Sequence, residues 1–460
     1  MKRLVCAASC SLLMLLAGCT VGPRYQKPAV NVPPGYRGQT AQEAGKVNAP
    51  SLGDEKWWTV FQDEELQKLI RTALKQSFDV RIAATRVLAS RAQLGITRAD
   101  QFPSASGTVG YTSEKIPGFG FNVMELQGSA SWNIDFWGKY RRATEAARAN
   151  LLATEWGRRA VISTVVSNVA TAYFQLREFD LELAIAQRTL ASRQESLQLT
   201  ETLANGGAAG LLDVRQAQQL VETAAESVPE LEREIQQQEN LISTLLGENP
   251  GGVPRGRKLT EQPLPPAIPA GLPSSLLERR PDIRQAEQQL IAANAEIGVA
   301  KAAYFPDISL TGTGGVESAS LASLFSGSAA AWNLVAAAPQ PIFTAGRLRS
   351  DLRLSQAQEQ QALLTYEQAI QQAFRQVSDS LIAYRRYREF REHQELLATA
   401  AQDAANLSEM RYKAGATSYL EVLTNETNYF AAQLNLARAR LNERLSLVQI
   451  YNALGGGWEQ

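Results

Sequence analysis

The cysteines are the residues of this chain whose placement points most directly to a reaction. All three, Cys6, Cys10 and Cys19, lie within the first 19 of the 460 residues. Lys2-Arg3 precedes an apolar stretch, and small residues lead up to Cys19, which is the pattern of a secretory signal. The segment Leu16–Cys19 looks like a bacterial lipobox, so we expect cleavage before Cys19 and acylation of its amine and thiol, for example with palmitate.

The segment around this cysteine also suggests a destination. Residues 1–18 form the predicted signal peptide, and Thr20 follows the cysteine where an aspartate would favour retention. By analogy with enteric lipoproteins, we expect sorting to the outer membrane of a Gram-negative bacterium. Residues 19–62 are rich in proline and glycine and predict an extended, acylated tether. The alternative is an ordinary signal peptide with an incidental cysteine.

The other reactive side chains do not form a catalytic set. His393 is the single histidine, so a histidine metal site or a catalytic triad lacks parts. The glycine-rich segment Gly312–Gly315 does not indicate a phosphate-binding loop, because it lies in an alternating segment and no lysine follows it. It indicates close strand packing or a turn. Lys+Arg and Asp+Glu both number 46, so no bulk basic field attracts nucleic acid. We therefore expect no enzyme, no cofactor, no metal site and no nucleic-acid partner.

A long-range repeat organises the chain. Phe102-Pro103 is echoed by Phe305-Pro306, and Trp132–Ile134 by Trp332–Leu334, in both cases about 200 positions later. Each copy has the order helix, alternating strands, very long helix, glycine-rich turn and helix. The first helix is expected to begin near Asp63, which can cap it, and to run towards Ala99. The predicted parts after the tether are a first repeat at 63–249, a proline-rich linker at 250–280, a second repeat at 281–454 and a tail at 455–460.

Alternating segments predict two β-hairpins. Between Met124 and Phe136 apolar residues alternate with polar ones, and residues 104–112 and 307–316 show the same pattern. A weaker strand is expected around Trp332–Val335. Each strand has roughly ten residues, which suits a tilted membrane strand, whereas no run after the signal reaches the ~18 apolar residues of a membrane helix. The alternative is a soluble hairpin with one buried face.

The long helices and the number of strands together predict an oligomer. Gly138–Asn205 and Gly346–Lys413 contain no proline and show near-heptad apolar spacing, so we expect coiled-coil helices on the order of 100 Å long. Four strands cannot close a barrel, and open edges do not survive in hydrocarbon. Two copies would give a filled barrel of eight strands, and three would give twelve with a lumen. Small polar inward residues favour three. The predicted fold class is therefore a mixed α and β chain, internally duplicated, in which a shared β-barrel continues into a helical barrel.

Several segments also carry a family resemblance. The chain is similar, over essentially its whole length, to the outer-membrane factors of the TolC family, in the acylated, OprM-like (NodT-type) branch. The matching segments are Leu277–Arg284, Ala286-Glu287, Ala303–Pro306, Pro341–Gly346, Asp135–Gly138, Leu454–Trp458 and Cys19–Tyr25. The resemblance implies a passive homotrimeric efflux conduit with a twelve-stranded barrel. It also implies a periplasmic adaptor and an inner-membrane transporter, usually of the resistance-nodulation-division class, as partners.

The turns between the long helices are the expected working parts. Gly206, Gly207 and Gly415 should lie at the periplasmic tip, where we expect them to meet the adaptor; plain turn chemistry is the alternative. Leu212 and Leu420 correspond across the repeat, as do Asp213 and Glu421, and threefold copies would place them in rings. The resemblance implies that a leucine, a tyrosine, an aspartate and an arginine hold the tip shut.

Only part of that closing set is present. Leu420 and Tyr412 match, but the aspartate position is Thr424 and the arginine position is Thr427. Our hypothesis is that the Leu420 ring, Tyr412 and the carboxylates close the tip instead; the alternative is that Leu420 only packs in the coiled coil. Two other functions stay open, a type I protein-secretion conduit and a periplasmic coiled-coil lipoprotein scaffold.

Overall fold

The computed structural model describes residues 20–38, 51–263 and 268–459, so Cys19 lies outside the described residues. The chain divides into two compact units. Of the described residues, the strand unit contains 20–30 together with Thr85–Trp156 and Arg284–Ala369. The helix unit contains Asn31–Ala84, Gly157–Ile283 and Ile370–Gln460. Each unit thus draws residues from both halves of the sequence.

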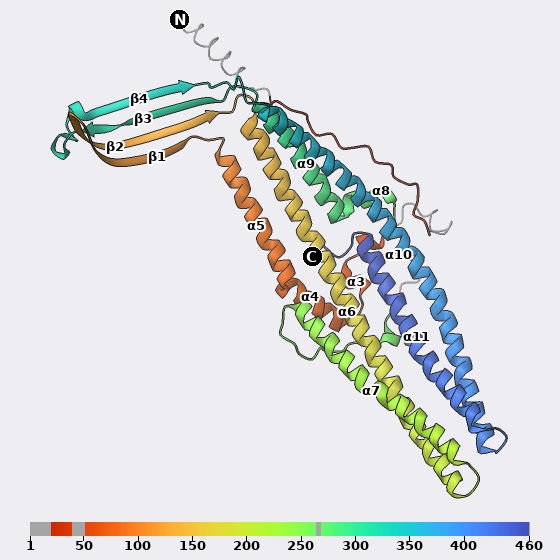
Figure 1. Ribbon diagram of the computed structural model, residues 1–460. Helices are drawn as coiled ribbons and strands as arrows, with labels where there is room; N and C mark the ends of the chain where they lie inside the picture. Colours follow the sequence, from red (N-terminus) through yellow and green to blue (C-terminus); the bar gives the residue numbers. More distant parts are fainter. Residues whose placement is uncertain (1–19, 39–50, 264–267, 460) are drawn as a thin grey trace. The chain divides into compact units, whose positions relative to one another are not determined.

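The order of helices and strands repeats along the chain (Figure 1). The first half contains α3 (Trp57–Val60), α4 (Glu64–Gln76), α5 (Phe78–Ala99), β1 (Ser104–Ile116), β2 (Phe119–Ile134), α6 (Lys139–Asn205) and α7 (Leu211–Leu246). The second contains α8 (Pro273–Arg279), α9 (Pro281–Ala302), β3 (Ile308–Ser318), β4 (Ala330–Ala337), α10 (Arg347–Lys413) and α11 (Tyr419–Ala453). Among the described residues, no helix combines the length and the apolar character needed to cross a membrane.

The strand unit holds one antiparallel sheet with the order β1-β2-β3-β4. Its register aligns polar residues in a row across all four strands, because directly paired residues share a face. The row is Ser106, Ser129, Thr313 and Asn333. The Ser106 and Ser129 hydroxyls lie 2.7 Å apart, which places both side chains on one face.

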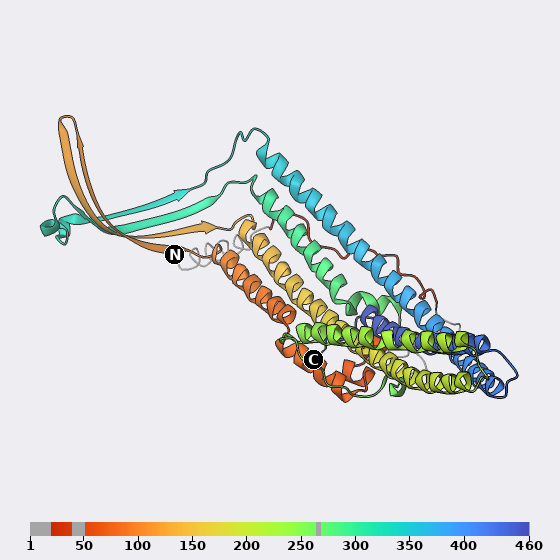
Figure 2. The same cartoon turned by 60° about the horizontal axis from the view of Figure 1, so that its bottom comes forward.

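The opposite face of the sheet is apolar. One row across all four strands is Val109, Leu126, Val316 and Ala330. The alternation predicted from the sequence is therefore present, with one polar and one apolar face. The β1–β2 hairpin is longer than the β3–β4 hairpin and extends beyond it (Figure 2).

Glycine makes the close approach of β2 and β3 feasible. A Cβ atom at Gly315 would lie 2.2 Å from the Leu126 carbonyl oxygen and 2.7 Å from the Gln127 Cα. No side chain fits at those distances without pushing the two strands apart. Of the two interpretations of Gly312–Gly315, close strand packing is confirmed at Gly315, whereas a Cβ atom at Gly314 would meet nothing within 4 Å.

The two long helices have matching beginnings. Both α6 and α10 contain 67 residues, and each follows a glycine in the left-handed region, Gly138 with φ 82° and Gly346 with φ 83°. Such a φ favours glycine because it has no Cβ atom. In α6, alanines at 146 and 149 pack closely against alanines at 292 and 295 of α9, within the strand unit. The small side chains let these two helix backbones approach each other.

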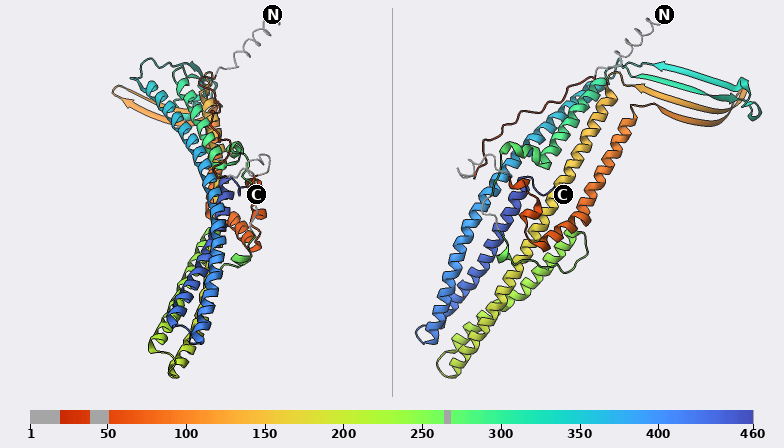
Figure 3. Two further views of the ribbon diagram at one scale, coloured as in Figure 1. Left: turned by 90° about the vertical axis from the view of Figure 1, so that its right-hand side faces the viewer. Right: turned by 180° about the vertical axis from the view of Figure 1, so that it is seen from behind.

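The helix unit is built from two helix pairs, α6–α7 and α10–α11, which lie side by side (Figure 3). Where they meet, Ile185 of α6, Leu231 of α7 and Phe430 of α11 form a buried apolar cluster. The near-heptad stripes predicted from the sequence therefore face one another. Burying a large apolar side chain stabilises a fold by about 1.5–3 kcal/mol, so these stripes are a principal support of the unit.

One expected helix is divided. The sequence predicted a single helix from near Asp63 to Ala99, but α4 ends before Ser77, whose backbone is extended at ψ 132°, and α5 begins at Phe78. The predicted cap is confirmed, since Asp63 accepts hydrogen bonds from the backbone N–H groups of Glu65 and Leu66. The break lacks a glycine or proline, which is why the sequence pattern did not indicate it.

Candidate functional site

The first turn of the helix unit connects α6 to α7. Gly207, with φ 76°, ends α6 in the left-handed region, and the Ala208 N–H donates to the Leu203 carbonyl, as in a Schellman cap. Immediately after the turn, Leu211 and Leu212 are 69% and 68% exposed. The first turn therefore presents two large apolar side chains at its surface.

The second turn connects α10 to α11 and has the same backbone but a different surface. Gly415 has φ 70°, and the Ala416 N–H donates to the Arg411 carbonyl. Tyr419, which corresponds to Leu211 in the first turn, is buried at 1% exposure, whereas Leu420 remains 55% exposed. The two turns of the repeat thus differ in how much apolar surface they present.

A buried cluster holds the two turns together. Tyr419 and Val422 of α11 pack with Ala217 and Leu220 of α7. The ring of Tyr412, in the last turn of α10, lies edge-on to Tyr419 with 5.1 Å between the centroids. The structure therefore places Tyr412 in a core that joins α7, α10 and α11, and not on an exposed surface.

The two tip carboxylates are engaged within the chain. The Asp213 carboxylate accepts a hydrogen bond at 3.0 Å from the backbone N–H of Gly210, so it caps the start of α7. The Glu421 carboxylate accepts a hydrogen bond at 2.8 Å from the Arg411 guanidinium and another from the Thr417 hydroxyl. Both carboxylates therefore stabilise their own turns, and Arg411 offsets the charge of Glu421.

Thr424 and Thr427 stand where the family resemblance implies an aspartate and an arginine, and each hydroxyl makes a hydrogen bond within α11. The Thr424 hydroxyl donates to the Leu420 carbonyl at 2.9 Å, and the Thr427 hydroxyl donates to the Leu423 carbonyl at 2.7 Å. Each bond runs back one helical turn, which is typical of threonine in a helix. Both side chains are exposed and carry no charge. Neither side chain can therefore form an ion pair with a neighbouring copy of the chain.

A buried ion pair that was not predicted from the sequence lies just behind the tip. Arg193 of α6 is among the most buried residues, and its Nε lies 3.8 Å from a carboxylate oxygen of Glu426 on α11. Its Nη1 donates to the Leu220 carbonyl at 2.8 Å. The heptad spacing gave little signal, because the apolar stripes of α6 and α11 continue at positions 194 and 427, one residue beyond Arg193 and Glu426. The two charged residues therefore lie beside the predicted core positions rather than on them.

Burial affects both members of this pair. It lowers the pKa of the Arg193 guanidinium, an effect that the Glu426 carboxylate opposes. It raises the pKa of Glu426, where the Arg193 charge acts in the opposite direction. The guanidinium also lies over the Phe430 ring at 5.1 Å from the centroid. The pair joins α6 to α11 in a region with little access to water.

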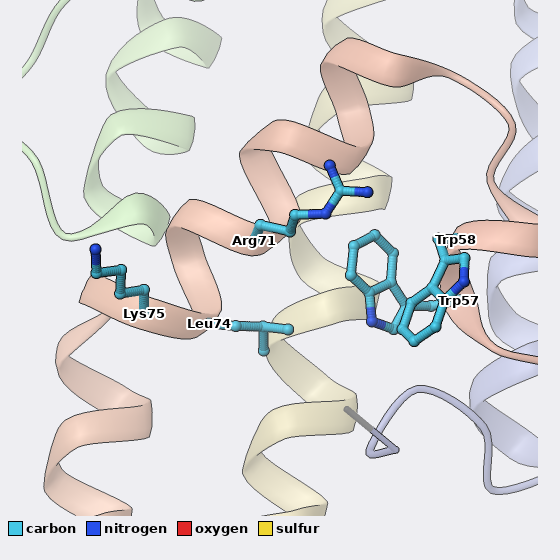
Figure 4. A pocket seen from close by; sticks show the side chains of 5 residues that line it. All are labelled: Trp57, Trp58, Arg71, Leu74 and Lys75. Atoms are coloured by element: carbon cyan, nitrogen blue, oxygen red, sulfur yellow. The ribbon is translucent and has the colours of Figure 1, made fainter.

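A separate hollow of about 550 Å³ lies beside α3 and α4 (Figure 4). Trp57 and Trp58 form one wall, and Arg71, Leu74 and Lys75 of α4 form the other. The Arg71 guanidinium lies 5.8 Å from the Trp57 ring centroid. No titratable pair that could transfer a proton lines this hollow. Within the described ranges, moreover, no cluster of three or more His, Cys, Asp or Glu side chains could hold a metal ion.

Cys19, the predicted lipid anchor, lies outside the described residues, but its neighbour Thr20 is described. Thr20 is the first described residue, and a Cβ atom on Gly138 would lie 2.7 Å from its Cγ2. The Val21 N–H donates to the Trp137 carbonyl at 3.1 Å. The described end of the tether therefore runs beside the junction between β2 and α6.

The sequence matches the family model for outer membrane efflux proteins over residues 69–248 and 272–456. It is 36% identical over 452 residues to the cation efflux system protein CusC of Escherichia coli O6:H1, with 97% of each chain covered. It is 37% identical over 461 residues to the solvent efflux pump outer membrane protein SrpC of Pseudomonas putida, again with 97% of each chain covered.

Solved structures give the same result for the fold. Crystal structures of CusC superpose with a TM-score of 0.87 at 34% identity, covering 95% of this chain and all of that one. The outer-membrane channel OprN superposes with a TM-score of 0.88 at 31% identity, covering 96% of this chain and all of that one.

These matches extend from the tether to the last helix, so they include both hairpins, both long helix pairs and both tip turns. They confirm the mixed α and β fold class and the family resemblance predicted from the sequence. They also confirm the predicted outer-membrane location and the role in efflux. The chain belongs to the outer membrane efflux protein family and is the outer-membrane channel of an efflux system.

Proposed function

We propose that three copies of this chain close a single twelve-stranded barrel and form a passive conduit across the outer membrane. The observation that carries this proposal is the open sheet. Within the described residues, β1 pairs only with β2 and β4 pairs only with β3, so both outer edges carry unpaired backbone groups. Unpaired edges cannot be tolerated in hydrocarbon, and pairing β1 of one copy with β4 of the next satisfies them.

The polarity of the two sheet faces supports three copies over two. The row from Ser106 to Asn333 lines one face with hydroxyl and amide groups, while the other face is apolar. A barrel of eight strands has an interior filled by side chains, which small polar residues cannot fill well. A barrel of twelve leaves a wet lumen for the polar face, with the apolar face toward lipid.

The exposure of the strands argues against the scaffold alternative. Soluble hairpins of a periplasmic scaffold need one buried face. Every residue of β4 is exposed, and β1 is exposed along nearly its whole length. Large apolar side chains on these strands, such as Trp332 at 83% and Val109 at 82% exposure, need a lipid or subunit environment.

We infer that the channel works with a periplasmic adaptor and an inner-membrane transporter of the resistance-nodulation-division class. The proposed source of energy is the transporter, because the family and the matched structures are outer-membrane channels. Small molecules are the proposed cargo, since the relatives are named for efflux of cations and solvents. The turns around Gly206, Gly207 and Gly415 are the proposed adaptor-docking surface, and acylated Cys19 is the proposed second anchor.

Closure of the tip is proposed to rest on apolar contact rather than on an ionic lock. Leu212 and Leu420 are exposed beside the two turns and are free to meet their copies around a threefold axis. Tyr412 supports them from the core, and Asp213 and Glu421 hold the shape of the turns. Thr424 contributes no charge. The proposed gate is therefore a hydrophobic constriction of the kind that closes pores by excluding water.

The deciding experiment is the protein mass of the detergent-extracted particle, followed by conductance in planar bilayers. A protein mass near three times that of the 50.2 kDa chain, reduced slightly by signal removal, supports the shared barrel. Such a particle should then produce channels in a bilayer. A monomer that stays soluble without detergent contradicts the channel assembly.

A further inference from the structure

A cavity of about 490 Å³ lies in the strand unit, where the strands join the long helices. It is enclosed by the end of β2, the residues before β3 and after β4, and the first turns of α6 and α10. The lining residues used below are Trp137, Lys139, Phe305, Asp307, Arg347 and Asp351. Nothing in the channel function requires a cavity at this place.

The position of the cavity along the strands determines its depth in the membrane. β2 ends at Ile134 and β3 begins at Ile308, and the lining residues follow directly outside these strand ends. Residues just beyond the ends of membrane strands lie at the membrane–water interface, where aromatic residues gather. Nearby, Ile342 and Phe343 are 96% and 88% exposed, and large apolar side chains at this depth are favourable only in contact with lipid or with another subunit.

The aromatic wall of the cavity is held by several contacts. The Trp137 and Phe305 rings stack with 4.6 Å between centroids and an interplanar angle of 23°. The Trp137 indole N–H donates to the Pro306 carbonyl at 3.0 Å, and the Asp307 N–H donates to the Pro339 carbonyl at 3.2 Å. The wall is therefore preformed, which lowers the entropy cost of binding a ligand.

The cavity combines two cations with two carboxylates. The Lys139 ammonium lies 3.1 Å from the Asp307 carboxylate, and both side chains are partly exposed. Arg347 and Asp351 lie one turn apart on α10, and neither side chain has a hydrogen-bond or ionic partner among the described residues. The site therefore offers both charges, and one member of each sign is unpaired.

We propose that this cavity binds the phosphoethanolamine headgroup of an outer-membrane phospholipid. Lys139 and Arg347 contact the phosphate, and Asp307 and Asp351 contact the ammonium. Charge-assisted hydrogen bonds of this kind are the strong ones, and basic pockets at a membrane surface bind lipid headgroups. A headgroup fits better than a soluble zwitterion because the cavity lies at interfacial depth and its exposed apolar neighbours, Ile342 and Phe343, can contact acyl chains.

The test is native mass spectrometry of the full channel reconstituted in nanodiscs that contain equal amounts of phosphatidylethanolamine and phosphatidylglycerol. The variant K139Q/R347Q should retain at least about tenfold less bound phospholipid than the parent, because it removes both phosphate contacts and the loss of one charge-assisted hydrogen bond alone corresponds to about that factor. The control R349Q/R353Q removes two exposed cations from the same helix outside the cavity and should retain the parent amount. Equal retention by the two variants overturns the proposal.

Two further arms identify the ligand chemistry. The variant D307N/D351N should shift the retained lipid from phosphatidylethanolamine to phosphatidylglycerol, because only the ammonium contacts are lost. An unchanged lipid ratio overturns the zwitterionic assignment. Inorganic phosphate should not displace the bound lipid, whereas displacement identifies a free-anion site and overturns the lipid proposal. Bilayer conductance of each variant, measured in parallel, separates loss of the lipid site from loss of the channel.

Discussion

Arg193 of α6 and Glu426 of α11 face each other in the helix unit with 3.8 Å between the guanidinium Nε and the carboxylate. This distance brings opposite charges together without a direct hydrogen bond between them, and Nε and Nη2 of Arg193 have no acceptor among the described residues. The two helices belong to different halves of the duplicated sequence. The pair therefore links the halves at a point close to the tip.

Removing either member of this pair should have unequal effects. Glu426→Ala leaves a charged arginine buried without its counter-ion, which destabilises the helix unit by about 3–5 kcal/mol. Arg193→Met should cost less, because Glu426, whose pKa is already raised by burial, can take up a proton. The measurement is the apparent melting temperature of the helical circular dichroism signal, with Arg188→Met as an exposed control. Equal, small shifts of the melting temperature for both variants would show that the ion pair does not contribute to stability.

Asp63 should be the most sensitive polar residue of the helix unit. Its carboxylate accepts hydrogen bonds from the Tyr173 hydroxyl at 3.0 Å and the Gln262 amide at 2.6 Å, in addition to capping α4. Asp63→Ala leaves these buried donors unpaired, which should destabilise the unit by about 3 kcal/mol or more. Tyr173→Phe removes one of these donors and also the acceptor of the Gly256 N–H, so it should cost about 2 kcal/mol. Chemical denaturation of both variants tests this order, and Asp79→Ala on the exposed start of α5 is the control.

Glu178 should make stability depend on pH in the neutral range. Burial, and then the neighbouring Glu182 carboxylate, raise the pKa of Glu178 to about 8 in the fold, against 4.5 for an ordinary glutamate. As the pH rises, the unfolded chain therefore releases this proton at a lower pH than the folded chain does. The resulting stabilisation is complete below about pH 4.5 and is lost as the pH rises through about 8.

The test compares the melting temperature of the parent and of Glu178→Gln across this pH window. The parent should lose stability between pH 5 and 8, and the glutamine variant should lose less because its side chain cannot ionise. Glu195→Gln, on the exposed side of the same helix, should follow the parent curve. Parallel curves for parent and Glu178→Gln would contradict a buried, protonated carboxyl.

The proposed gate predicts a leak when its apolar side chains are shortened. Leu420→Ala and Leu212→Ala should each raise single-channel conductance and susceptibility to bulky antibiotics, since a wider constriction admits water more readily. Leu397→Ala shortens a 52% exposed leucine elsewhere on α10 and should leave conductance unchanged. Glu421→Gln should affect conductance less than Leu420→Ala does, because Arg411 already offsets that charge.

Much of the fold could be predicted because it depends on periodicity. The spacing of apolar residues predicts a strand in β2, and the same kind of pattern predicts long helices in the proline-free stretches before Asn205 and Lys413. Glycines in the left-handed region marked both turns, since few other residues adopt that conformation. The break at Ser77 could not be predicted, because only its extended backbone separates two segments that are each good helices.

The site was predicted less completely. Corresponding positions in the two repeats pointed to Leu212 and Leu420, whose role at the tip stays a prediction. The neighbouring pair behaves differently, since Tyr419 is buried where Leu211 is exposed. Packing between helices, not the local sequence, decides this difference. The role of the Asp213 and Glu421 carboxylates in tip closure also stays a prediction, and the sequence did not indicate that each of them holds its own turn. Contacts between distant helices, such as that of Arg193 with Glu426, leave no more in the sequence than a charged residue beside an apolar stripe.

The unpaired edges of β1 and β4 have a genetic consequence. If three chains must complete one ring, a cell that makes intact and pairing-deficient chains in equal amounts builds only about one eighth of its rings from intact chains alone. Alleles that disrupt pairing at β1 should therefore be dominant, whereas alleles that abolish expression should be recessive. Whether such an allele lowers efflux in cells that also carry the intact allele would then show whether the strands of different chains pair in living cells.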